Sequence, residues 1–77
     1  MRRMQKLLCD YRSDHDLTWR EMALMVGQTS RYLHDVARGR RRCRPQSARR
    51  YAEALSCDPQ QWITAALLDC IEDSIDE

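Results

Sequence analysis

Residues 17–39, which read LTWREMALMVGQTSRYLHDVARG, contain the clearest helix signals in the chain. Thr18 is followed three positions later by Glu21, the spacing of a capping box, in which each side chain binds the backbone N–H of the other residue. Gly27 suits the left-handed backbone at a helix C-terminus. The apolar residues between these ends recur at helical spacing: Trp19, Met22, Ala23 and Val26. This pattern predicts a helix over about residues 18–26.

A second short helix follows after a turn of only a few residues. Thr29 is a natural N-cap, and Gly39 marks the end. Leu33, Val36 and Ala37 share one face of this helix. Two short helices joined by a three- to four-residue turn that contains glycine have the layout of a helix-turn-helix. The residues expected to face outward are all hydrogen-bonding types: Ser30, Arg31, Tyr32, His34 and Asp35.

The rest of the chain also has helical patterns, and strand signals are sparse. Residues 3–13 have an apolar stripe, Pro45 opens a helix, and Asp58-Pro59 is typical of the start of a last helix. A chain of 77 residues builds one small core, so we expect a single domain over residues 1–77. The sequence therefore predicts an all-α fold of five helices.

Charge is divided unevenly along the chain. All thirteen Lys and Arg lie within residues 1–50, where five acids oppose them and leave a net charge of +8. Residues 51–77 contain seven acids and no base. This asymmetry favours a basic face for a polyanion and an acidic element directed away from it, the alternative being two solvated faces of opposite sign. The acids expected to point away are Asp69, Glu72, Asp73, Asp76 and Glu77.

The four cysteines do not have the spacing of a metal site. Cys9, Cys43, Cys57 and Cys70 form no CxxC pair, and neither histidine is paired with a cysteine at a zinc-site spacing. We expect reduced thiols, with Cys57 and Cys70 packed in apolar stripes. We expect no metal ion and no other cofactor.

The sequence disfavours a membrane or secreted protein, and it disfavours an enzyme. No apolar run approaches the roughly 20 residues that span a bilayer, and the N-terminus lacks the apolar segment of a secretory signal, so we expect a cytoplasmic protein. There is no glycine-rich phosphate loop and no Ser/His/Asp or Cys/His constellation at a convincing spacing. A domain of this size also has little room for a buried pocket, so we expect no enzymatic activity.

Several short motifs, taken together in order and spacing, resemble the lambda-repressor and Cro type of helix-turn-helix domain. They are Leu17-Thr18, Ala23, Gly27, Leu33, Val36 and Gly39, followed by Pro45, residues 48–55 (ARRYAEAL) and Asp58-Pro59. The resemblance covers about residues 7–68 and leaves residues 69–77 as an acidic end of the last helix. It implies a five-helix DNA-binding fold common in bacterial and phage regulators. In that fold the helix between Thr29 and Gly39 enters the major groove, the preceding helix lies across the DNA backbone, and two copies form a symmetric dimer.

The chain departs from the family at three positions. Trp19 stands where many members have a glutamine that touches a phosphate. Ala37 stands where a glutamate often pairs with an arginine near the end of the first helix, here Arg12, which is thereby released for a phosphate. Ser56 replaces a common glycine after the fourth helix.

The resemblance places Ser30, Arg31 and Asp35 on the base-reading positions, with Thr29 at their entry and Tyr32 and His34 adjacent. Arg31 is the main candidate because a guanidinium bridging guanine O6 and N7 is the commonest specific contact. A phosphate contact remains the alternative for Arg31, and no role at all remains the alternative for His34. Asp35 could accept from cytosine N4 or orient Arg31 one turn earlier.

Phosphate contacts are expected from the basic loop and from the neighbouring helix ends, because position matters less than charge for such contacts. The alternative is a solvated loop. The residues expected at the DNA backbone are Arg12, Trp19, Arg20, Thr29, Arg38, Arg40, Arg41, Arg42 and Arg44. Arg2, Arg3 and Lys6 fit a minor-groove arm and fit a plain helix start equally well.

The predicted function is a sequence-specific regulator of transcription that binds double-stranded DNA, most simply a repressor, as a homodimer on a pseudo-palindromic operator. The dimer interface is expected on the apolar stripe of the last helix, at Ile63, Leu67, Cys70 and Ile71, the alternative being that this stripe completes the monomer core. An antitoxin-like autoregulator, whose acidic last helix binds a basic partner protein, is the alternative function.

Overall fold

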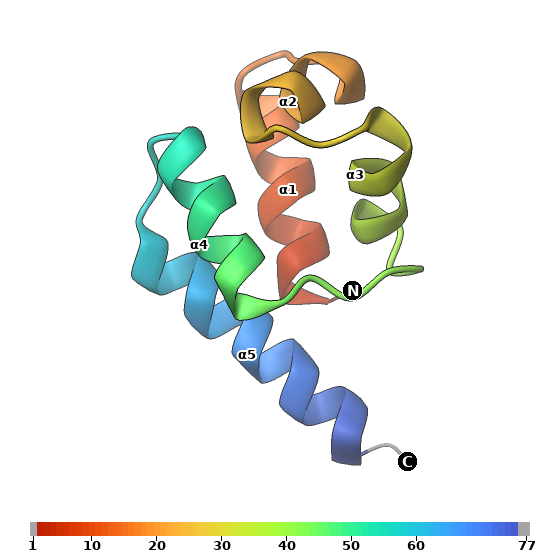
Figure 1. The fold of residues 1–77 in the computed structure, drawn as a ribbon, viewed down its shortest axis with the longest axis vertical. Helices are drawn as coiled ribbons and strands as arrows, with labels where there is room; N and C mark the ends of the chain where they lie inside the picture. The colour runs from red at the N-terminus through yellow and green to blue at the C-terminus, as the bar shows by residue number, and fades with distance from the viewer. Residues whose placement is uncertain (1, 76–77) are drawn as a thin grey trace.

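The computed structural model describes residues 2–75, and the side chains of residues 2–72. Five helices and no strand are present in this part of the chain, and Figure 1 shows their arrangement. They are α1 (Arg3–Asp14), α2 (Trp19–Val26), α3 (Ser30–Ala37), α4 (Pro45–Ala54) and α5 (Pro59–Ile75). The predicted all-α fold of five helices is confirmed.

The ends of α2 and the start of α3 follow the local signals in the sequence. The Glu21 N–H donates to Thr18 Oγ1 at 3.1 Å, and the Thr18 N–H donates to Glu21 Oε1 at 3.0 Å, which completes the capping box. The hydrogen bond from the Thr18 backbone is the main cause that lowers the pKa of the Glu21 carboxyl group. Gly27 has a φ of +74°, in the left-handed region, and Thr29 Oγ1 accepts the Tyr32 N–H at 3.1 Å. The three predicted features are confirmed.

The connection between α4 and α5 contains a strained residue. Ser56 has a φ of +58°, a backbone conformation that costs an L-residue free energy and that glycine adopts readily. The turn is held by a hydrogen bond from the Cys57 N–H to the Ala52 carbonyl at 2.8 Å. Asp58 Oδ1 then accepts the Gln60 N–H at 3.1 Å, as expected for the N-cap of α5.

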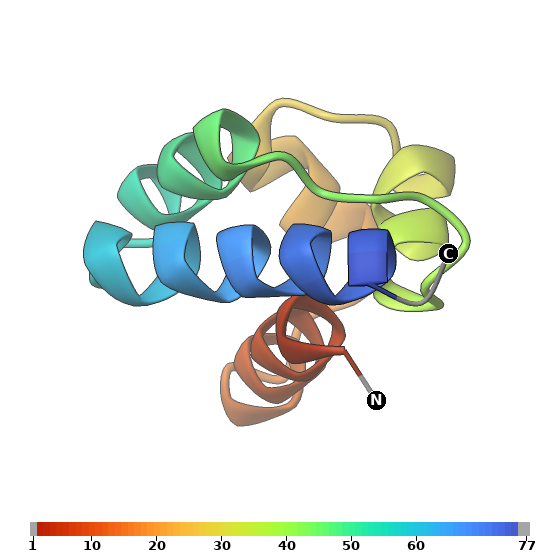
Figure 2. The same cartoon turned by 90° about the horizontal axis from the view of Figure 1, so that it is seen from below.

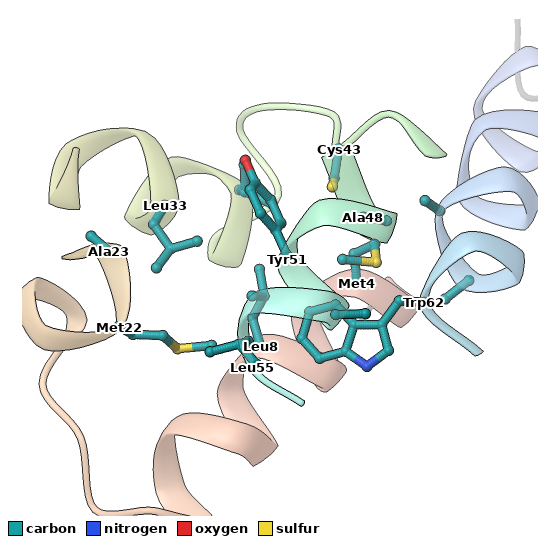
Figure 3. Close-up of a cluster of buried hydrophobic side chains, with 14 residues drawn as sticks. Met4, Leu8, Met22, Ala23, Leu33, Cys43, Ala48, Tyr51, Leu55 and Trp62 are labelled. Atoms are coloured by element: carbon teal, nitrogen blue, oxygen red, sulfur yellow. The ribbon is translucent and has the colours of Figure 1, made fainter. Parts of the chain in front are cut away.

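All five helices contribute to one core. α5 packs along α4 and α1, and Figure 2 shows it running between these two helices, while α3 packs on α1 and α2. Figure 3 shows side chains from every helix meeting in this core. The largest of those that are fully buried are Trp62, Tyr51, Leu8, Met22 and Leu33.

Cysteine burial differs from the expectation. Cys43, in the loop between α3 and α4, is buried with 4% of its surface exposed, whereas Cys57 and Cys70 are half-buried. Burial raises the pKa of the Cys43 thiol to about 12, so the neutral thiol packs as a small apolar group. None of the four cysteines, all of which lie within the described residues, forms a disulfide. Cys43 anchors one end of the arginine-rich loop in the core.

The prediction that Asp69 points away with the other acids is wrong. Only 4% of Asp69 is exposed, and its carboxylate accepts the backbone N–H groups of Arg3 at 3.1 Å and of Met4 at 3.0 Å. The first turn of α1 has no acidic residue, so its open N–H groups take their acceptor from α5. The Arg3 guanidinium lies 3.4 Å from Asp69 and 2.7 Å from Glu72. The side chain of Asp73, and residues Asp76 and Glu77, lie outside the described part.

Candidate nucleic-acid interface

A concave basic surface lies between the C-terminal end of α3, the following loop and the start of α1. This surface, the basic hollow, encloses about 730 Å³. Five of its eight lining residues are arginines and none is an acid. The lining residues are Arg2, Tyr32, Gly39, Arg40, Arg41, Arg42, Arg44 and Ser47. Four of the predicted backbone-contact arginines therefore meet in one place.

The loop wall of the basic hollow is formed where α3 ends. Gly39 has a φ of +77°, and its N–H donates to the Val36 carbonyl at 3.1 Å. The Asp35 carbonyl accepts the N–H of Arg40 at 2.9 Å and the N–H of Arg41 at 3.3 Å. These hydrogen bonds turn the chain back on the helix end, and so they fix where the first loop arginines leave the backbone.

Gln5 joins the two walls of the basic hollow, and the sequence analysis did not identify it. Its Oε1 accepts the Arg2 N–H at 2.8 Å, and its Nε2 donates to the Ala37 carbonyl at 3.1 Å. Gly39 lies against the same amide, because a Cβ on Gly39 would be 3.0 Å from Gln5 Nε2. Gln5 thus fastens Arg2, the N-cap residue of α1, to the segment that carries the loop arginines. No local pattern marks a contact between residues 32 positions apart.

Tyr32 was expected on the outward face of α3, but it faces the basic hollow instead. It is half-buried and packs against the core. The Arg41 guanidinium lies 4.9 Å from the centre of its ring, within the range of a cation–π interaction. Beneath it, Tyr51 is buried, and this burial raises the Tyr51 pKa. Tyr32 therefore serves as a wall of the basic hollow, about 100° around the helix from Arg31.

The outward face of α3 carries several of the predicted base-reading residues. Ser30 and Arg31 are exposed in its first turn, and Arg38 is exposed at its C-terminal end. His34 and Asp35 are half-buried on the same side. Within the described residues Arg31 and Asp35 form no ion pair with each other. The Arg31 guanidinium is therefore available to a ligand on this face.

Arg12 and Trp19 belong to a cluster that reaches α3 at His34. The Arg12 guanidinium donates to the Leu17 carbonyl at 3.1 Å and lies 5.0 Å from the centre of the Trp19 ring. The Trp19 ring centre is 5.7 Å from that of His34. Arg12 thus holds the turn between α1 and α2, while Arg20 is exposed on α2. The Thr29 hydroxyl is occupied as the N-cap of α3.

Only part of the predicted interface stripe on α5 is exposed to solvent. Ala66, which precedes Leu67 in α5, is fully buried in the monomer. Leu67 and Ile71 remain exposed at 48% and 46%, and Ile63 and Cys70 are half-buried beside them. Leu68, which the stripe did not include, is also exposed. Part of the last helix thus completes the monomer core, and an apolar face with Leu67 and Ile71 is left in contact with solvent.

Comparisons with known proteins add no further information. No protein-family model, curated protein or solved structure matches this chain. Among the described residues, no three His, Cys, Asp or Glu side chains are grouped so that they could hold a metal ion. None of the helices, over the same residues, has the length and apolar character needed to cross a membrane.

Proposed function

We propose that this protein is a sequence-specific regulator that binds double-stranded DNA, with α2 and α3 as a helix-turn-helix of the lambda-repressor type. The observation that carries the proposal is the position of the exposed polar face of α3 next to the basic hollow. A single short helix thereby offers base-reading groups on one side, and at its C-terminal end it leads directly into a loop that can bind phosphates.

Base readout is assigned to the exposed side of α3. The major groove is wide enough for an α-helix, and each base pair presents a distinct pattern of donors and acceptors there. Arg31 supplies a guanidinium for guanine, and Ser30 supplies a hydroxyl that is a donor and an acceptor. His34 and Asp35 lie one turn further along, where their half-burial limits the directions in which they can reach.

Backbone binding is assigned to the basic hollow together with Arg38 and Arg20. Arg40, Arg41 and Arg44 form no ion pair within the described part of the chain, so their charge is available to phosphates. Such contacts supply affinity and orientation, and they carry no sequence information. Trp19 keeps an indole N–H for one phosphate, whereas Arg12 contributes by holding the turn that precedes α2.

A second copy of the chain is the proposed partner on the DNA. One recognition helix covers few base pairs, and a two-fold axis places two such helices roughly 34 Å apart, in successive major grooves. The exposed apolar face of α5, with Leu67 and Ile71, supplies the surface for this contact. A dimer seated on a promoter excludes polymerase, so repression is the simplest outcome. A basic partner protein at the acidic end is less well supported, because Asp69 is buried and Glu72 pairs with Arg3.

Selection from a pool of duplexes with a randomised central segment tests this function. The full chain should enrich one pseudo-palindromic motif, with half-sites one helical turn apart. Arg31→Ala protein in a parallel selection should lose preference at one position of each half-site. A pool that remains random after several rounds would overturn the proposal.

A further inference from the structure

We propose that the basic hollow is also a binding site for a free anion with several linked phosphates, such as a nucleoside triphosphate or inorganic polyphosphate. Binding there would compete with DNA for the same arginines. Only this competition rests on the proposed function, since binding of the free anion requires no DNA.

Hydrogen bonds within the chain hold the walls of the basic hollow in place. Gln5 binds the Arg2 N–H and the Ala37 carbonyl, and so it joins the α1 wall to the loop wall. The Asp35 carbonyl holds the N–H groups of Arg40 and Arg41. Buried Cys43 anchors the loop just before Arg44. A site whose walls are already in place loses less conformational entropy when a ligand binds.

The charge and size of the basic hollow match an anion with several linked phosphates. A volume of about 730 Å³ lies within the usual range of roughly 300–1,000 Å³ for small-molecule sites. Arg40, Arg41 and Arg44 come from different points of the loop, and each guanidinium can bind two phosphate oxygens. One orthophosphate carries too little charge for three such groups. A chain of linked phosphates presents the several anionic groups that the lining can bind.

The lining of the basic hollow also includes an aromatic side chain. Tyr32 offers the only aromatic ring among the lining residues, and Arg41 lies 4.9 Å from the centre of that ring. Aromatic rings and guanidinium planes are the groups on which nucleobases stack. The contribution of Tyr32 to binding therefore distinguishes a nucleotide from inorganic polyphosphate, which both carry linked phosphates. A nucleotide should gain affinity from the ring, whereas inorganic polyphosphate should not.

Isothermal titration of the full chain with tripolyphosphate, in magnesium-free buffer at physiological ionic strength, tests the site directly. We expect saturable binding of one anion per chain. The double variant Arg40→Ala with Arg41→Ala should weaken binding by more than about tenfold, because charge-assisted hydrogen bonds are lost. Arg50→Ala is the matched control, since Arg50 is exposed on α4 and does not line the basic hollow. Far-ultraviolet circular dichroism checks that each variant is folded.

The same titration with ATP identifies the source of the phosphates. Tighter binding of ATP than of tripolyphosphate, lost in Tyr32→Leu, indicates a nucleotide, and equal binding indicates inorganic polyphosphate. Either result supports the site. Absence of saturable tripolyphosphate binding would overturn the proposal, and so would equal weakening by Arg50→Ala, which would show attraction to net charge alone. Because these titrations contain no DNA, they separate failure of this site from failure of DNA binding.

A second measurement on the wild-type chain does not depend on any substitution. In amide NMR spectra, tripolyphosphate should shift the signals of Gly39, Arg40, Arg41 and Ser47 and leave those of α5 in place. Shifts spread evenly over all exposed arginines would contradict a defined site. Where the chain binds DNA, added tripolyphosphate should release it in the wild type and should release it less effectively from the Arg40→Ala, Arg41→Ala variant.

Discussion

The Asp69 carboxylate lies 3.0 Å from the backbone nitrogen of Met4, so the last helix supplies an acceptor for the N-terminus of the first. The same turn of α1 carries Gln5, which binds the Ala37 carbonyl at the end of α3. A buried acid on α5 is thereby connected through α1 to the wall of the basic hollow. The acid-rich end of the sequence thus has a structural role as well as a charge.

Removing the negative charge of Asp69 should destabilise the whole domain. Asp69→Asn keeps the size of the side chain but loses a charge-assisted acceptor for two N–H groups, which should cost about 1–3 kcal/mol in the free energy of unfolding. Urea denaturation measures this difference. Glu72→Gln, at an exposed ion pair with Arg3, is the control and should change stability by less than about 1 kcal/mol. Equal losses in both variants would contradict the capping role.

Replacing Ser56 by glycine should stabilise the protein. Ser56 has a φ of +58°, and glycine removes the steric cost of that conformation, with an expected net gain of about 0.5–1 kcal/mol after the higher entropy of the unfolded chain is counted. Thermal unfolding gives the sign. Ser13→Gly, near the C-terminal end of α1, is the opposite case and should lower stability by up to about 0.5 kcal/mol. A lower melting temperature for Ser56→Gly would show that the serine side chain stabilises the turn.

The features that the sequence predicted correctly depend on neighbours in the chain. Thr18 and Glu21 are three residues apart, and Gly27 and Thr29 act on the helix ends beside them, so helix starts and stops could be placed from residue type and spacing. The arginine-rich loop was also identified, because five arginines within residues 38–44 are visible as composition.

The features that were missed depend on tertiary contacts. Asp69 acts on a helix 65 or 66 positions away, and Gln5 on a carbonyl 32 positions away, and neither contact leaves a local pattern. Tyr32 was assigned to the outward face with the other hydrogen-bonding residues of α3, although a tyrosine suits either side of a helix. Which side it occupies was decided by the packing of α4 beneath it, at Tyr51.

Introducing charge on the exposed face of α5 should separate the proposed dimer. Aspartate at both Leu67 and Ile71 buries two charges in an apolar contact and should leave a folded monomer. Sedimentation velocity at micromolar concentration should show a dimer for the wild type and a monomer for the variant. Leu24→Asp, at the most exposed large apolar side chain among the described residues, is the control and should remain a dimer. A wild-type monomer both free and on DNA would refute this interface.

Removing the loop charge should weaken binding to every DNA sequence alike. If Arg40, Arg41 and Arg42 each neutralise a phosphate, replacing all three by alanine should lower the slope of log affinity against log salt by about 2–3. The preference among sequences should stay the same, because phosphate contacts carry no sequence information. Arg50→Ala, outside the basic hollow, should change the slope by less than one unit. An unchanged slope in the triple variant would show a loop that is only solvated.

Whether α3 reads base pairs is decided at Arg31, the exposed guanidinium in the first turn of that helix. The measurement is the dissociation constant of wild type and Arg31→Ala for a set of duplexes that differ from the selected operator by one base pair each. We predict a loss of about 1–3 kcal/mol on the operator and a flattened preference for G·C at one position of each half-site, with folding unchanged. An equal loss on operator and random DNA, with the G·C preference intact, would contradict the claim.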